Sequence, residues 1–241
     1  MGAACDCSFC HNWAVAIDYR AALVAFDRAY GGISDLAVGL SRADLLAFSR
    51  CHGWVVADVL FHLLCDAQRA LVALASPASG PPDRDFVSYW TGFATAADDP
   101  VPDAWRVRRS AAAFLDGTGV VTLWQETAPA AVRAAGSAVP DGYITTQGHV
   151  LAVPDFLTTL VTEAVIHHLD MTVELRSAPS PGPEAVALAT CTLDGLLGSG
   201  VSRPGTWTTE EYLLKGTGRL PLSLQDRGAL GDATERIPLL S

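Results

Sequence analysis

The sequence predicts a mainly α-helical protein, a helical bundle with a small C-terminal appendage of α or α+β structure. Apolar residues recur at helical spacing along several long segments, whereas few stretches alternate with the period of two that is typical of strands. The composition is 50% hydrophobic and only 17% charged, which suits a large buried core. These observations together favour helices packed on helices.

Helix-stop signals divide the bundle, which we expect to span residues 12–176. The first helix is expected to end at Gly31-Gly32 and the second at Ser76-Pro77, while Gly117 and Gly119 separate two later helices. The expected helices are 12–30, 54–75, 103–115, 121–135 and 154–176.

A Ser- and Pro-rich linker is expected at 177–183, followed by an appendage at 184–241. The appendage shows helical patterns at 184–197 and 209–215, and again after Ser223. It is too small to be stable with a core of its own, so we expect it to pack on the bundle.

The net charge and the hydropathy of the sequence limit the classes of molecule that the protein is expected to bind. The formal net charge of the 241 residues is −10, which disfavours nucleic acid and anionic membrane surfaces as partners. No signal-peptide pattern opens the sequence, and no run reaches the roughly 18 uninterrupted apolar residues of a spanning helix. We expect a cytoplasmic protein, monomeric or homodimeric, that binds a small molecule rather than nucleic acid or membrane.

Six cysteines occur, and without a secretion signal we expect them to be reduced. Three of them, Cys5, Cys7 and Cys10, precede His11 in an N-terminal tail at residues 1–11. Thiolates and an imidazole could ligate zinc there, but the spacing does not match paired CxxC knuckles. We therefore favour a tail whose cysteines are incidental over a metal or redox site.

The expected helix at 154–176 carries ionisable groups on an apolar face. Glu163 and His167 are spaced i and i+4, so both side chains reach one point on the helix surface, and Asp170 lies on the same stripe. A carboxylate and an imidazole placed in this way can bind a divalent metal. An ion pair within a polar cluster is the alternative. His168 lies about 100° away around the helix.

His62, on the expected helix at 54–75, offers a further imidazole. It shares a polar stripe with Asp58, Asp66 and Arg69, so periodicity alone leaves it at the margin of the apolar face, in a solvated charge network. The alternative places His62 at the rim of a cleft, where Asp58 or Asp66 steadies its second ring nitrogen.

Two segments resemble a known family. CHGWVVADVLFHLLCDAQRAL and VTEAVIHHLDMTVEL resemble the Trp–Asp–His-Leu and Glu-xxx-His-xx-Asp helices of the mycothiol-dependent maleylpyruvate isomerase family, part of the DinB-like superfamily. The stretch EYLLKGTGRLPLSLQDRGALGDATERIPLL is similar to tails of relatives with a Thr-Gly-Arg turn. The resemblance covers the chain from about residue 12 to the end.

The resemblance implies a DinB-like four-helix bundle whose metal is held by His62, Glu163 and His167. The metal of the isomerase is zinc, and nickel is the alternative from other superfamily members. Asp170 would then have a structural or supporting role. Arg219 resembles an arginine near the active site of relatives and would pair with a substrate carboxylate, or else it is a surface arginine that ends a turn. The C-terminal region is shorter than that of the isomerase, so the isomerase's substrate is not assumed.

A function follows as an expectation. Three protein ligands leave coordination positions open, which is typical of catalytic zinc, and the resemblance implies a low-molecular-weight thiol such as mycothiol as cofactor. We expect an isomerase or S-transferase acting on a small electrophilic metabolite. A metal-dependent hydrolase with the same site, or a non-catalytic binding protein, are the alternatives. His168, His149 or an N-terminal cysteine would favour the non-catalytic alternative if one of them filled an open position.

Overall fold

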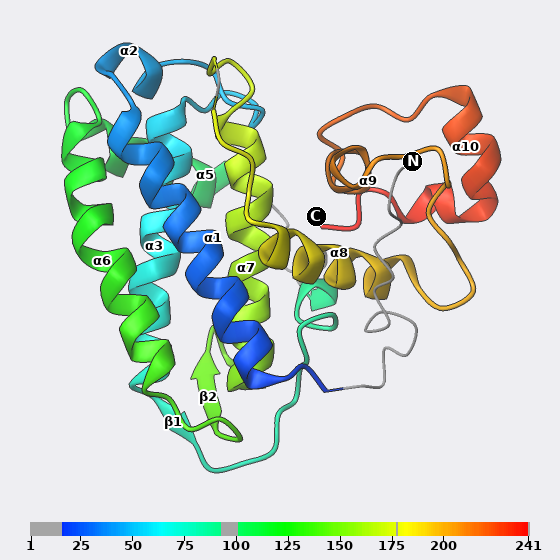
Figure 1. The fold of residues 1–241 in the computed structure, drawn as a ribbon, viewed down its shortest axis with the longest axis horizontal. Helices are drawn as coiled ribbons and strands as arrows, with labels where there is room; N and C mark the ends of the chain where they lie inside the picture. The colour runs from blue at the N-terminus through cyan, green and yellow to red at the C-terminus, as the bar shows by residue number, and fades with distance from the viewer. Residues whose placement is uncertain (1–15, 93–100, 177, 241) are drawn as a thin grey trace.

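Long helices pack side by side as a bundle in the described part of the chain (Figure 1). The computed structural model describes residues 16–92, 101–176 and 178–240. In this structure α1 contacts both α6 and α7, and α3 contacts the same two helices. Their bounds are α1 (Tyr19–Gly39), α3 (Val56–Leu74), α6 (Thr118–Gly136) and α7 (Val153–Met171). The mainly α-helical, DinB-like class is therefore confirmed.

Shorter elements connect the long helices along the chain. In the described residues these include α2 (Arg42–Leu45), η1 (Trp90–Gly92) and α5 (Val101–Ala112). A small antiparallel sheet has the order β1 (Pro77–Ala78), β2 (Tyr143–Thr146), β3 (His149–Ala152). Gln147 and Gly148 both have positive φ, +47° and +81°, as a tight two-residue hairpin turn requires. The hairpin leads directly into α7.

The first helix was expected to end at Gly31-Gly32, and this expectation is wrong because α1 continues to Gly39. Each helical glycine costs about 1 kcal/mol relative to alanine. The turns that follow bury Ile33, Leu36 and Ala37, and that apolar burial offsets the cost. The expected start at residue 12 is also wrong, since residues 16–18 precede the helix.

The helix expected to reach residue 176 ends at Met171. Thr172 follows as the C-cap, and its hydroxyl donates to the carbonyl oxygens of His168 and Leu169. The other expected helices with two stated ends lie within three residues of their observed bounds.

The C-terminal helices pack on one side of the bundle. The helix α8 (Pro183–Leu197) contacts α1 and α7, and α9 (Thr209–Gly216) contacts α8 and α7. Figure 1 shows α10 (Leu224–Leu230) on the same side, beyond α9; the 3-10 helix η2 (Gly231–Arg236) follows it in the chain. The turn after α9 contains Gly218 with φ +73°, and it carries Arg219 toward α7.

An indole hydrogen bond joins two helices inside the bundle. Trp124 of α6 is fully buried and packs on Tyr30 of α1, with ring centroids 5.2 Å apart. Its Nε1 atom donates to Ser34 Oγ at 3.0 Å. The hydroxyl of Ser34 therefore satisfies the only polar atom of a large buried side chain.

Replacing Ser34 with Ala is expected to lower the free energy of unfolding by about 1–2 kcal/mol, because the buried indole N–H loses its acceptor. Urea denaturation followed by tryptophan fluorescence measures the change. Ser202→Ala, at an exposed position, serves as the matched control. An unfolding midpoint of Ser34→Ala equal to that of the control would contradict this account of the contact.

Candidate metal centre

Three side chains from two helices converge at one point. His62 lies on α3, and Glu163 and His167 lie one turn apart on α7. Glu163 Oε2 is 3.5 Å from His62 Nε2 and 3.1 Å from His167 Nε2. One ligand atom from each residue lies within 4.8 Å of the other two. Helical spacing places Glu163 and His167 together on α7, and the packing of α3 against α7 adds the imidazole of His62 to them.

The side chains differ in exposure. His167 is buried, whereas the side chains of His62 and Glu163 keep 26% and 24% of their surface exposed. Trp54 stands edge-on to the His62 ring, with centroids 5.9 Å apart, and limits its rotation. Two imidazole nitrogens and one carboxylate oxygen form a donor set that suits a divalent ion such as Zn²⁺, and the partial exposure leaves that ion accessible from outside.

Asp170 holds His167 from behind. Its Oδ2 atom accepts from His167 Nδ1 at 3.0 Å, so Nδ1 carries a proton and Nε2 is the nitrogen that faces Glu163. Arg219 in turn donates to both oxygens of Asp170, through Nε at 3.1 and 3.2 Å and through Nη2 at 3.0 Å. Asp170 is fully buried. The Arg219 side chain thereby fixes the carboxylate that orients His167.

The electrostatics of Asp170 follow from these contacts. Burial alone raises the pKa of its carboxyl, but the hydrogen bond from His167 and the charge of Arg219 outweigh burial and lower the pKa to about 2. Asp170 is therefore ionised at neutral pH and can accept both bonds.

Glu163 and His167 form a tightly linked pair in the metal-free protein. Burial raises the pKa of Glu163, yet hydrogen bonds with His167 and His62 outweigh it and hold that pKa well below its usual value. Burial lowers the pKa of His167, but bonds with Asp170, Cys51 and Glu163 outweigh it and raise that pKa well above 6.5. His167 is thus a cation between two carboxylates, and a divalent ion would displace its proton from Nε2.

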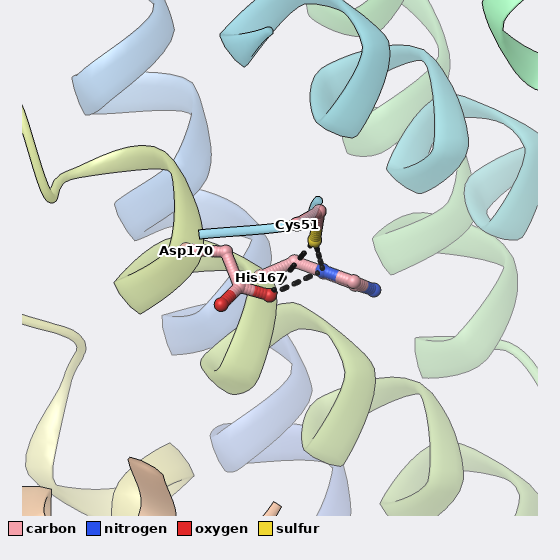
Figure 2. Close-up of side chains that lie close together, drawn as sticks. All are labelled: Cys51, His167 and Asp170. Carbon is pink, nitrogen blue, oxygen red and sulfur yellow. Dashed lines mark hydrogen bonds and ion pairs between the residues drawn. The ribbon is translucent and has the colours of Figure 1, made fainter. Parts of the chain in front are cut away.

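Cys51 joins this network through its thiol. Figure 2 shows Cys51, His167 and Asp170 pointing toward one another. The thiol donates to Asp170 Oδ2 at 3.2 Å and lies 3.8 Å from His167 Nδ1. The backbone N–H of Arg50 donates to the Asp170 carbonyl, which fixes the turn that carries the thiol against the end of α7.

Cys51, His167 and Asp170 also lie close enough together to hold a metal ion. A cation at that position would have to displace Arg219 from Asp170 and the proton from His167 Nδ1. The cluster of His62, Glu163 and His167 would bind an ion without displacing an arginine. We therefore treat Cys51 as a hydrogen-bond donor to Asp170 and the histidine–glutamate cluster as the candidate metal site.

Two further carboxylates of α3 were expected to steady the second ring nitrogen of His62. Asp58 instead accepts from the backbone N–H of Val55 at the start of the helix. Asp66 approaches the nitrogen of His62 that faces the metal site, with Oδ2 3.8 Å from Nε2, and not the second ring nitrogen Nδ1. Neither carboxylate makes the expected contact in the described part of the chain.

The histidines considered as blockers of the site lie elsewhere. His168 Nε2 is 2.8 Å from the Pro179 carbonyl oxygen, and His149 pairs with Asp83 beside the hairpin. The N-terminal cysteines and His11 lie outside the described residues. Cys51 and Cys65 are free thiols, as expected, whereas Cys191 is disulfide-bonded and corrects the expectation of fully reduced cysteines.

A four-helix bundle that gathers two histidines and a glutamate from two of its helices defines a DinB-like protein. The profile of the family described as mycothiol maleylpyruvate isomerase N-terminal domain matches residues 26–172. This match spans more than half of the chain, from α1 to the end of α7, and the chain belongs to that family. It includes the three candidate ligands but not Arg219.

Searches of curated proteins and of solved structures return no significant match. Within the described ranges, no helix is long and apolar enough to cross a membrane.

Proposed function

We propose that the protein is a metal-dependent isomerase or S-transferase that adds a low-molecular-weight thiol of the mycothiol type to a small electrophilic metabolite and then either isomerises the adduct and releases the thiol or retains the thioether as product. The observation that carries the proposal is the approach of His62 Nε2, Glu163 Oε2 and His167 Nε2 to within 4.8 Å of one another. Membership of the mycothiol maleylpyruvate isomerase N-terminal domain family supports the thiol part of the proposal.

The donor set fits the metal. His62 and His167 would each supply a neutral imidazole nitrogen and Glu163 would supply a negative charge, while Asp170 keeps the proton of His167 on Nδ1. A divalent ion held there, Zn²⁺ or alternatively Ni²⁺, would lower the pKa of a thiol and polarise a carbonyl group. The partly exposed His62 and Glu163 side chains would admit both small molecules.

Arg219 would act mainly through Asp170. The Nε–Nη2 edge, which pairs best with a carboxylate in two bonds, already holds Asp170, and Nη1 donates to the Thr217 carbonyl. Its side chain remains 20% exposed, so an anionic group of the substrate could still approach it. We propose positioning of Asp170 as its first role and substrate contact as its second.

The thiol dependence gives the test. Untagged, zinc-loaded protein is incubated with maleylpyruvate, or with a fluorogenic alkyl halide, in the presence and absence of mycothiol. We expect turnover of at least one substrate only when thiol and metal are both present, and loss of that turnover in Glu163→Gln. Full turnover without thiol would replace the proposal by a metal-dependent hydrolase, and no turnover with either substrate would favour a non-catalytic binding protein.

A further inference from the structure

Asp66 carries a buried carboxylate oxygen that lacks a hydrogen-bond partner in the described part of the chain. The residue lies one turn after His62 on α3 and is only 2% exposed. Its Oδ1 atom accepts from Arg69 Nη2 at 2.6 Å. Its Oδ2 atom has no hydrogen-bond partner among the described residues. Leaving such an atom unsatisfied costs about 1–3 kcal/mol, and more for a charged group, so a ligand that contacts this oxygen would relieve that cost.

The position of this oxygen points to the metal. It lies 3.8 Å from His62 Nε2, the same nitrogen that lies 3.5 Å from Glu163 Oε2. Around a tetrahedral ion with bonds of about 2.0–2.1 Å, neighbouring ligand atoms are roughly 3.3–3.4 Å apart. The separation of Asp66 Oδ2 from His62 Nε2 exceeds this value by about 0.4–0.5 Å, and Asp66 is not among the residues whose ligand atoms all lie within 4.8 Å of one another, so its side chain would have to move toward the ion in order to bind it.

The two helices offer matched pairs. On α3, His62 and Asp66 are spaced i and i+4, and on the facing helix α7 the pair is Glu163 and His167. Spacing of this kind places both side chains of a pair at one point on the helix surface, and α3 and α7 are in contact. Each helix therefore presents one imidazole and one carboxylate toward the other.

The neighbouring charges also fit. Arg69 forms an ion pair with Oδ1 of Asp66, and Arg219 forms one with Asp170. An arginine therefore fixes the position of each of these two carboxylates. The carboxylates of Asp66 and Glu163, with two neutral imidazoles, would together neutralise a divalent cation.

We propose that Asp66 is a fourth protein ligand of the metal, which makes the donor set two histidines and two carboxylates. This inference rests on the proposed metal site and extends it. A set of nitrogen and oxygen donors without sulfur suits Zn²⁺, Mn²⁺ and Ni²⁺. A substrate thiol would then enter by raising the coordination number, as zinc sites do when they accept a fifth ligand.

The experiment uses Mn²⁺ as a paramagnetic probe in the wild-type protein. One sample is labelled with ¹³C at the side-chain carboxyl of every Asp, and a second at the side-chain carboxyl of every Glu. Electron–nuclear double resonance then detects each carboxylate that is bonded directly to the ion. We expect a strong ¹³C coupling in both samples. Asp66→Asn should remove the coupling of the Asp-labelled sample and weaken Mn²⁺ affinity about tenfold or more.

Asp58→Asn is the matched control, because Asp58 lies on the same helix but bonds to the Val55 backbone; its coupling and affinity should equal those of the wild type. A Glu coupling without an Asp coupling in the wild-type protein would overturn the role of Asp66 and keep the metal site. The absence of both couplings, or of Mn²⁺ and Zn²⁺ binding, would overturn the metal site itself. Both outcomes come from wild-type protein, so they do not depend on how well the variant folds.

Discussion

Replacing His167 with Ala is expected to weaken zinc binding by on the order of 10²–10³-fold. Zinc sites built from four protein ligands bind with about 10–16 kcal/mol, which is roughly 2.5–4 kcal/mol for each ligand, and each 1.4 kcal/mol is tenfold in affinity. Because His167 also joins Glu163 to Asp170, its loss disorders a second ligand as well. Competition with a chromogenic chelator, on untagged protein, measures the dissociation constant.

His149 provides the matched control. Like His167, it pairs with a carboxylate, here Asp83 at 3.1 Å, but it is partly exposed and lies beside the hairpin. His149→Ala should bind zinc as tightly as the wild type, while His62→Ala and Glu163→Gln should follow His167→Ala. If all three substitutions at the cluster left the affinity unchanged, the assignment of the ligands would be wrong.

Replacing Asp170 with Ala is expected to lower the free energy of unfolding of the metal-free protein by about 3–5 kcal/mol. Removal of one partner from a buried ion pair leaves the other charge without compensation. Here Arg219 would lose its carboxylate, and His167 and Cys51 would lose their common acceptor. Chemical denaturation monitored by circular dichroism gives the free energy.

A second substitution tests the cause. Combining Asp170→Ala with Arg219→Leu removes the uncompensated charge, so the double variant should recover part of the lost stability. Asp83→Ala removes a carboxylate from an exposed pair with His149 and should cost less than about 1 kcal/mol. A cost for Asp170→Ala as small as that of Asp83→Ala would show that the network does not stabilise the fold.

The pH dependence of the free energy of unfolding tests the role of Asp170 independently. The pKa of Asp170 is about 2 in the folded protein, below its ordinary value of 3.8, so its contribution to stability is present above about pH 4 and is lost as the pH falls toward 2. The difference corresponds to about 2 kcal/mol. Between pH 5 and pH 2 the wild type should therefore lose about 2 kcal/mol more than Asp170→Asn does.

Local geometry explains which parts of the site the sequence could predict. Glu163 and His167 are one helical turn apart, and any helix through residues 160–170 places them together. The position of Asp170 on the same stripe follows from the same period. Helix-stop signals failed at Gly31-Gly32, where burial of the next turns outweighs the local cost of glycine.

Local sequence patterns could not predict the contacts between segments that are distant in the chain. The periodicity of α3 left His62 at a polar margin, and only the packing of α3 on α7 brings its ring to Glu163. Cys51 precedes α3 in a turn with no periodic signal, and its place depends on the bond from the Arg50 backbone to the Asp170 carbonyl. Family resemblance, rather than spacing, was the signal that joined His62 to the pair.

A crystal of zinc-loaded, untagged protein measured on both sides of the zinc absorption edge tests the central claim most directly. We expect an anomalous peak that lies about 2.0–2.2 Å from His62 Nε2, Glu163 Oε2 and His167 Nε2. A peak beside Cys51 and Asp170 instead, or zinc bound only at surface positions remote from α3 and α7, would contradict the account.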